Sequence, residues 1–106
     1  MKTLILACCI SALTATAQNN AKPAGDPGQG KKVFERCSAC HFPYGTSVKV
    51  GPGLQGLFKR TKLENGNRCN ETSVREIIEH GGKTMPAFAG LSKTDKDDLM
   101  AYLKTL

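Results

Sequence analysis

Two cysteines, Cys37 and Cys40, stand three positions apart and are followed at once by His41. Thiolate sulfur and imidazole nitrogen are both common ligands of metal ions in proteins. Such a group suits a disulfide, half of a zinc site, a redox switch or a covalent tether for a prosthetic group. Each of these uses fixes the local backbone, so this cluster constrains the possible folds more than any other stretch of the chain.

The first 17 residues have the pattern of an export leader. A basic start at Lys2 precedes an uncharged apolar run from Leu4 to Ala15, and Ala15-Thr16-Ala17 forms a small-x-small cleavage site. A retained membrane anchor is the alternative, but this run is shorter than the roughly 20 residues that span a bilayer. The predicted organisation is a signal peptide over 1–17, a flexible segment over 18–25 and one domain over 26–106. No stable membrane span is expected after leader removal.

Cleavage changes the number of thiols and the charge of the chain. Cys8 and Cys9 leave with the leader, so that five cysteines become three, and the formal net charge of +6 loses one unit with Lys2. Export to an oxidising compartment permits a disulfide, but three cysteines cannot all pair within one chain. At least one of the remaining cysteines therefore has another role.

The predicted domain is small and has few apolar side chains for a core. A domain of this size buries only roughly 60% of the surface that its unfolded chain exposes. The chain holds four Phe, two Tyr and no Trp, against 11 glycines. Domains this small are usually stabilised by a disulfide, a metal or another cross-link. A large apolar cofactor at the centre would supply the missing core.

The segment before the cysteine cluster has a helix-start signal. Asp26 is a good N-cap and stands directly before Pro27, the residue favoured at the first helical position. We predict a short helix that continues to about residue 36 and leads into Cys37. From Phe42 to Asn70 the sequence lacks helical periodicity and is rich in glycine, so we predict a long loop that wraps a bound group.

Two further helices are predicted in the C-terminal third. Ser73 followed by Glu76 reads as a capping box that opens one helix, which Gly81 ends. A second capping box begins at Ser92 and opens the last helix. The apolar stripe of that helix consists of Leu99, Tyr102, Leu103 and Leu106. The chain is therefore predicted to be all-α, with three helices and long loops.

The spacing of Cys37, Cys40 and His41 matches the attachment motif for c-type haem. The two thiols add across the two vinyl groups of haem, whose separation suits cysteines three apart on a helical turn. The adjacent imidazole then binds the iron. The predicted cofactor is one covalent haem c, with Cys37 and Cys40 as its attachment residues and His41 as an axial ligand.

A second axial ligand is expected downstream, where Met85, Met100, His80 and Cys69 are available. Met85 follows a double glycine and precedes a proline, so a loop presents its thioether. Thioether sulfur binds ferrous iron well and raises the reduction potential relative to a second histidine. Met100 lies on the last helix and is expected in the core. His80 ends its helix, where its charge suits the helix dipole. We predict Met85 as the ligand.

Four stretches in this order resemble class I c-type cytochromes, the small secreted monohaem electron carriers. They are "GQGKKVFERCSACH", "GPGLQGLFKR", "TMPAFAG" and "LMAYLKTL", which together extend over nearly all of the predicted mature chain. The resemblance implies a cytochrome c fold, an all-α bundle of about three to four short helices wrapped around covalent haem. It also implies that the first and last helices cross at Gly30, Phe34, Leu99 and Tyr102.

The resemblance adds two residues around the predicted haem. It implies that the carbonyl of Pro52 accepts a hydrogen bond from His41 Nδ1, which orients the ring and tunes its donor strength. It also implies that Arg60 meets a haem propionate. The family's glycine before that arginine is Lys59 here, and no tryptophan is present. Cys69 has no counterpart in the pattern. We expect it to be buried and inert, and if exposed it could pair between chains.

The basic residues are expected to gather around the haem edge and the acidic ones elsewhere. Three aspartates, Asp95, Asp97 and Asp98, stand on the last helix. A positive rim would attract redox partners that have acidic docking faces. The equal alternative is that these basic residues simply form an ordinary solvated surface. Nucleic acid is a poor fit for an exported chain without a basic and aromatic platform. The basic residues expected at the rim are Lys31, Lys32, Arg36, Lys49, Lys59, Arg60, Lys62 and Lys83.

The sequence thus predicts a monomeric, periplasmic electron carrier with His41 and Met85 as axial ligands, not an enzyme. Two ligands that stay bound leave no open position on iron for a substrate. One alternative is a haem c subunit dedicated to a periplasmic dehydrogenase or oxidase. A remote alternative is a structural zinc site made of Cys37, Cys40 and Cys69 with His41 or His80.

Overall fold

The computed structural model describes residues 24–106, which fold as three α-helices and one short 3₁₀ helix joined by long loops. The helices are α1 (Pro27–Phe34), α2 (Glu71–His80) and α3 (Lys93–Leu103), and the 3₁₀ helix is η1 (Leu57–Lys59). Within this range there is no named strand, only an isolated antiparallel bridge between Lys62 and Arg68. The all-α prediction is confirmed. The predicted signal peptide and residues 18–23 lie outside the described residues.

Helix α1 begins as the sequence predicts. The side chain of Asp26 accepts hydrogen bonds from the backbone N–H of Gly28 and Gln29, and Pro27 is the first helical residue. The α-helix ends at Phe34, slightly before the predicted end. Tight turns then continue the coil, because Cys37 N donates to Phe34 O at 2.7 Å. The cysteine cluster is thereby attached directly to the end of α1.

Helix α2 begins three residues earlier than the capping pattern at Ser73 predicts. The N-cap is Asn70, whose side chain accepts from Ser73 N at 2.9 Å, while Ser73 Oγ accepts from Asn70 N at 3.1 Å. Ser73 is thus the third residue of a capping box and not its cap. Asn and Ser are about equally good caps, so the pattern alone did not separate them. The predicted end at Gly81 is confirmed.

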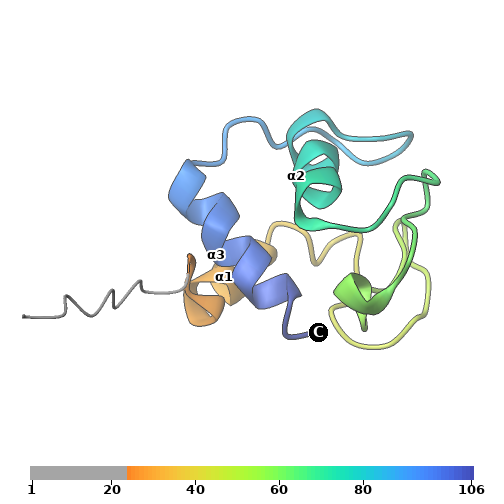
Figure 1. The fold of residues 1–106 in the computed structure, drawn as a ribbon, viewed down its shortest axis with the longest axis horizontal. Helices are drawn as coiled ribbons and strands as arrows, with labels where there is room; N and C mark the ends of the chain where they lie inside the picture. Colours follow the sequence, from red (N-terminus) through yellow and green to blue (C-terminus); the bar gives the residue numbers. More distant parts are fainter. Residues whose placement is uncertain (1–23) are drawn as a thin grey trace, which may run out of the picture.

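Helices α1 and α3 cross in direct contact (Figure 1). At the crossing Gly30 lies so close to α3 that a Cβ atom on it would collide with the carbonyl oxygen of Asp98 and come within 2.7 Å of Tyr102 Cβ. The rings of Phe34 and Tyr102 pack beside it, with centroids 5.4 Å apart and planes inclined by 55°. Three of the crossing residues implied by the family resemblance, Gly30, Phe34 and Tyr102, therefore lie at the crossing, and the fourth, Leu99, is buried on α3.

The buried core residues come from the three α-helices, from η1 and from Leu91 in the loop before α3. Leu99 and Met100 are each only 1% exposed. Truncating either to alanine is expected to cost about 2–5 kcal/mol of stability. Met100 is therefore a core residue, as the helical pattern predicted. The other buried apolar residues are Phe34, Leu57, Val74, Ile78, Leu91, Tyr102 and Leu103.

A chain of ion pairs ties α2 to α3. Arg75 Nη2 donates to Glu71 Oε1 at 2.9 Å and to Asp97 Oδ1 at 2.6 Å. Lys93 pairs with Asp97, and Lys104 pairs with Glu71. The hydrogen bond from Lys104 lowers the pKa of Glu71, and that from Lys93 lowers the pKa of Asp97, with Arg75 acting on both carboxylates. Single ion pairs at a protein surface contribute little to stability, but these pairs share residues and form a network, which can contribute more.

The Gly30 contact predicts a large cost for a single methyl group. Gly30→Ala should lower the free energy of unfolding by about 1–3 kcal/mol, because the helices must separate to admit the Cβ atom. Gly90→Ala is the control, since a Cβ there meets nothing within 4 Å. Denaturant unfolding of both variants gives the comparison. Equal stabilities would contradict the close crossing.

The ion network predicts acid sensitivity. A folded-state pKa below the unfolded value means that the stabilising effect is complete above the unfolded pKa and is lost as pH falls through the folded one. Stability should therefore decline below about pH 4.5, the ordinary pKa of Glu71. Arg75→Gln should flatten this decline, whereas Arg68→Gln should not, because Arg68 joins none of the ion pairs among the described residues. Urea unfolding from pH 7 to pH 3 measures both.

Candidate cofactor site

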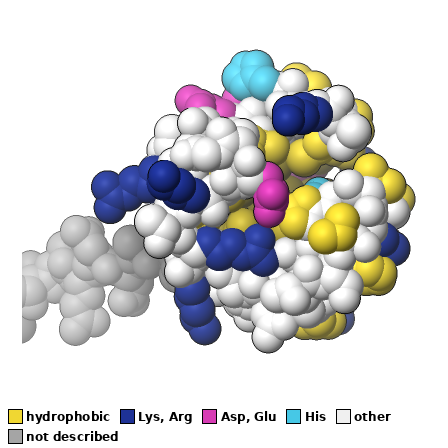
Figure 2. Space-filling model, turned by 90° about the vertical axis from the view of Figure 1, so that its right-hand side faces the viewer, with side chains coloured by type: hydrophobic (Ala, Val, Ile, Leu, Met, Phe, Trp, Pro, Cys, Tyr) yellow, Lys and Arg dark blue, Asp and Glu magenta, His cyan; other side chains and the backbone are white. Residues whose placement is uncertain are grey.

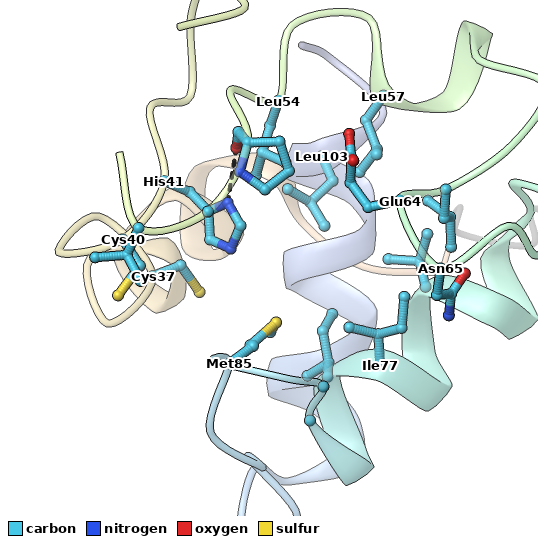
Figure 3. Close-up of a pocket in the computed structure, with 18 of the residues that line it drawn as sticks. Cys37, Cys40, His41, Leu54, Leu57, Glu64, Asn65, Ile77, Met85 and Leu103 are labelled. Atoms are coloured by element: carbon cyan, nitrogen blue, oxygen red, sulfur yellow. Dashed lines mark hydrogen bonds between the residues drawn. The ribbon is translucent and has the colours of Figure 1, made fainter. Parts of the chain in front are cut away.

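A cavity of about 430 Å³ opens between the cysteine cluster, the loop after α2 and the inner face of α3 (Figure 3). Its lining is mainly apolar, with Leu54, Leu57, Ile77 and Leu103 among the residues that form it. The cavity is seen from outside as a hollow bordered by hydrophobic side chains, with acidic and basic side chains near its mouth (Figure 2). Its volume falls within the roughly 300–1,000 Å³ typical of cofactor and ligand sites.

Cys37, Cys40 and His41 all line one wall of this cavity. A helical turn holds them, with His41 N donating to Cys37 O at 2.9 Å and Cys40 N to the same oxygen at 3.1 Å. Both cysteines are half-buried free thiols. Burial, followed by the neighbouring Cys40, raises the pKa of Cys37, so this thiol is held in its neutral form. The sequence motif is therefore presented as a single face.

The orientation of His41 is fixed by the next loop. Its Nδ1 lies 2.8 Å from the carbonyl oxygen of Pro52. A carbonyl oxygen only accepts, so Nδ1 carries the proton and donates it, which leaves Nε2 free as a metal ligand. Figure 3 shows this bond and the opposite side of the ring turned toward the cavity. The contact that the resemblance implied for Pro52 is thus present in the structure.

Met85 reaches the same cavity from the loop after α2. Gly81 ends the helix with φ of +73°, and Gly82 N donates to Met85 O at 3.0 Å, which folds the chain back on itself. The Met85 side chain is half-buried, and its sulfur points into the cavity across from His41 (Figure 3). The structure therefore brings the predicted second ligand to the opposite side of the space that His41 enters.

Arg60 also lines the cavity, and its side chain holds the backbone of the preceding loop. Its Nη2 donates to Gly53 O at 2.6 Å and to Gln55 O at 3.0 Å. Both acceptors are backbone carbonyls of the loop that carries Pro52. Arg60 thus stabilises the loop that orients His41, in addition to the charge that it brings to the cavity wall.

The other candidate ligands lie away from the cavity. His80 is exposed and its Nδ1 lies 3.1 Å from Glu76 O. Cys69 is half-buried rather than buried, and its thiol donates to Leu57 O at 3.1 Å. That it is inert stays a prediction. Across residues 24–106 no three His, Cys, Asp or Glu side chains gather as a metal site would require. The zinc site that was the remote alternative is therefore not assembled among these residues.

The basic residues considered for a positive rim lie in different places. Of the eight basic residues, Arg60 and Lys83 line the cavity. Lys32 and Arg36 instead line a smaller hollow between α1 and α3, together with Asp95 and other residues. The sequence reasoning did not find Glu64 and Asn65, which also line the cavity. Their loop shows no motif, and only the tertiary fold brings it over α2.

A further surface feature that the sequence reasoning missed lies in the loop after His41. Four large apolar residues of this loop are exposed, and Val50 among them also lines the cavity. The one charged residue of the loop, Lys49, lies over the ring of Phe42 at 4.5 Å and donates to Ser38 O. The other exposed apolar residues are Tyr44 and Val48.

The donor set and the apolar cavity fit a haem. Two adjacent thiols, an imidazole with a free Nε2 and a facing thioether surround an apolar space, and no wall residue other than Arg60, Glu64 and Lys83 carries a full charge. The fold and the site thus define a small all-α haem protein in which the haem is attached covalently to the chain.

Known proteins place the chain more narrowly. A sequence model described as "Cytochrome c" matches residues 28–106. Cytochrome c of Euglena viridis is 34% identical over 77% of this chain and 98% of its own. Cytochrome c2 of Rhodospirillum rubrum is 31% identical over 100% of this chain and 99% of its own. The solved structure of cytochrome cH from Methylobacterium extorquens is 28% identical, with a TM-score of 0.59 over 77% of this chain and 100% of that one.

This chain belongs to the cytochrome c family. The fold is the all-α cytochrome c fold, and the family binds haem c covalently through Cys-x-x-Cys-His. Cys37 and Cys40 stand at the attachment positions, so the predicted cofactor is confirmed. Family membership also makes the protein an electron carrier that uses haem c. In the described residues no helix is long and apolar enough to cross a membrane.

The bonds of Arg60 predict a structural cost for its removal. Arg60→Gln should lower the free energy of unfolding by about 1–3 kcal/mol, because hydrogen bonds from a charged donor to two carbonyls are lost. Lys59→Gln is the matched control, since the neighbouring Lys59 is exposed and makes no such bond. Thermal unfolding of the haem-loaded proteins measures the difference. Indistinguishable midpoints for the two variants would contradict this role of Arg60.

Proposed function

We propose that the protein is a periplasmic electron carrier in which His41 and Met85 are the two axial ligands of the haem iron. The observation that carries the proposal is the arrangement around the cavity: Cys37, Cys40 and His41 form one wall, and Met85 faces them from another segment. His41 and Met85 come from separate segments of the chain, so their meeting in one space is a property of the whole fold.

The chain's own residues prepare the site for electron transfer. Bound haem c supplies a one-electron couple between ferric and ferrous iron. The thiols of Cys37 and Cys40 would hold it by covalent bonds. His41 Nδ1 keeps its proton and donates it in a hydrogen bond to the Pro52 carbonyl, which strengthens the imidazole as a ligand. The apolar walls exclude water, which lowers the local polarity and so tunes the potential. The thioether of Met85 favours the ferrous state.

Two permanent ligands distinguish a carrier from a catalyst. When both sides of the iron are occupied in both oxidation states, no position is open to a substrate or to dioxygen. The rigid attachment of His41 by the Pro52 carbonyl and of Met85 by the turn at Gly82 supports such permanence. We therefore assign no enzymatic activity to this site.

The proposed partners are redox proteins with acidic docking faces. The proposed carrier acts as a monomer. The support is the chain's net charge of +6, which leader removal lowers by only one unit, and the placement of Arg60 and Lys83 at the cavity. Opposite charges raise the rate of encounter, and salt reduces it. The periplasmic location is supported by the leader pattern over 1–17, whose cleavage after Ala17 would begin the mature chain at Gln18.

Carbon monoxide binding tests the ligand assignment. The reduced wild-type protein should not bind carbon monoxide at neutral pH, because Met85 blocks the sixth position. Met85→Ala should bind it rapidly, with a large shift in the visible spectrum. The matched control is Met100→Leu, a change of similar volume in the core, which should still exclude the gas. Binding by the wild-type protein would refute permanent ligation by Met85.

A further inference from the structure

The backbone of Gly51 lies against the imidazole ring of His41. A Cβ atom on Gly51 would lie 2.7 Å from Nδ1 and 2.9 Å from Nε2 of that ring, and closer still to Cε1. Contacts shorter than 3.0 Å are essentially never made by real Cβ atoms. The space between this backbone and the ring therefore admits a hydrogen atom and no side chain.

Backbone conformation does not explain why residue 51 is a glycine. The glycines with positive φ among the described residues are Gly25, Gly45, Gly56, Gly66 and Gly81. Gly51 is not among them, so an alanine could adopt its backbone angles without the left-handed strain. Glycine is required at this position because the His41 ring occupies the space that a side chain would need.

Gly51 cannot move away from the ring without breaking other bonds. Its N–H donates to Cys40 O at 2.8 Å, and its own carbonyl accepts from Lys49 N at 3.0 Å. The next residue, Pro52, holds the ring through the 2.8 Å contact with His41 Nδ1. The segment is thus fastened to the cysteine cluster on one side and to the imidazole on the other.

We propose that Gly51 is a positioning residue for the axial histidine. The Pro52 carbonyl fixes one atom of the ring, and the bare Cα of Gly51 limits rotation about that point. Together they hold His41 in one orientation toward the cavity. This inference rests on the proposed ligation by His41, and it concerns what sets the angle of the ring about the bond to iron.

Haem-loaded Gly51→Ala tests the proposal by spectroscopy. In the ferric protein, the paramagnetic NMR shifts of the haem methyl groups depend on the plane of the histidine ring, so their pattern should change. In the ferrous protein, the His41 Nδ1 proton should exchange with solvent about tenfold faster, the scale of one lost hydrogen bond. The reduction potential should move in the positive direction, because a weaker donor stabilises ferric iron less.

Gly90→Ala is the matched control. Gly90 does not line the cavity, has no positive φ, and a Cβ there meets nothing within 4 Å. It should leave the methyl pattern, the proton exchange and the potential unchanged. A methyl pattern and an exchange rate in Gly51→Ala that equal those of the wild type would overturn the proposal.

A second measurement covers the case in which Gly51→Ala does not accumulate with haem. In the ferrous wild-type protein, the Gly51 Hα protons should give a nuclear Overhauser effect to the His41 Hε1 proton. Its presence supports the contact, and its absence overturns the proposal. Failure of the proposed function looks different: the wild-type protein would then lack His41 ring signals shifted by the haem, whatever the state of Gly51.

Discussion

The crossing of α1 and α3 at Gly30 is the contact on which the site depends. Helix α1 ends immediately before the turn that carries Cys37, and α3 supplies Leu99 and Leu103 to the cavity wall. The distance between the two helices therefore sets the distance between the attachment thiols and the far apolar wall. A side chain at position 30 would push α1 and α3 apart and so separate the attachment thiols from the apolar wall. The site therefore requires glycine at a position that does not itself line the cavity.

The long loop between the cysteine cluster and α2 has little secondary structure, yet its backbone is well bonded. Gly51 N donates to Cys40 O, Leu54 N donates to Phe42 O, and Arg60 closes the loop through two further carbonyls. Buried backbone groups need such partners, and here the segment around His41 supplies several of them. The same bonds that satisfy the loop also bring the Pro52 carbonyl to the imidazole. Loop stability and ligand orientation are therefore one property of the structure.

Local chemistry explains which features could be predicted from the sequence. The caps at Asp26 and Ser92 act within three residues of themselves, and the cysteine motif is equally local, so each could be found by pattern. The predicted start of α2 was wrong because Asn70 and Ser73 are both suitable N-cap residues. Only the folded backbone decides which of them caps the helix. The steric role of Gly51 depends on a residue ten positions earlier, and a pattern of residue types carries no signal for such a contact.

The placement of Glu64 and Asn65 shows the same limit at longer range. Both belong to a polar, glycine-containing stretch that resembles any solvated loop, yet both line the cavity. The isolated bridge between Lys62 and Arg68 closes this stretch into a narrow turn. The bridge pairs two residues that no local pattern links, so the sequence carries no signal that this turn lines the cavity.

The basic residues that the sequence analysis expected at the haem edge lie in more than one place on the surface. The basic residues Lys32 and Arg36 lie beside Asp95 in the hollow between α1 and α3, where opposite charges offset one another. Near the cavity, the exposed side chain of Val50 adds apolar area, and Lys49 is engaged by Phe42 and by a backbone carbonyl. Arg60 and Lys83 line the haem cavity, together with the acidic Glu64. A partner that docks there would meet a mixed surface, so attraction between opposite charges would govern its approach more than its final affinity.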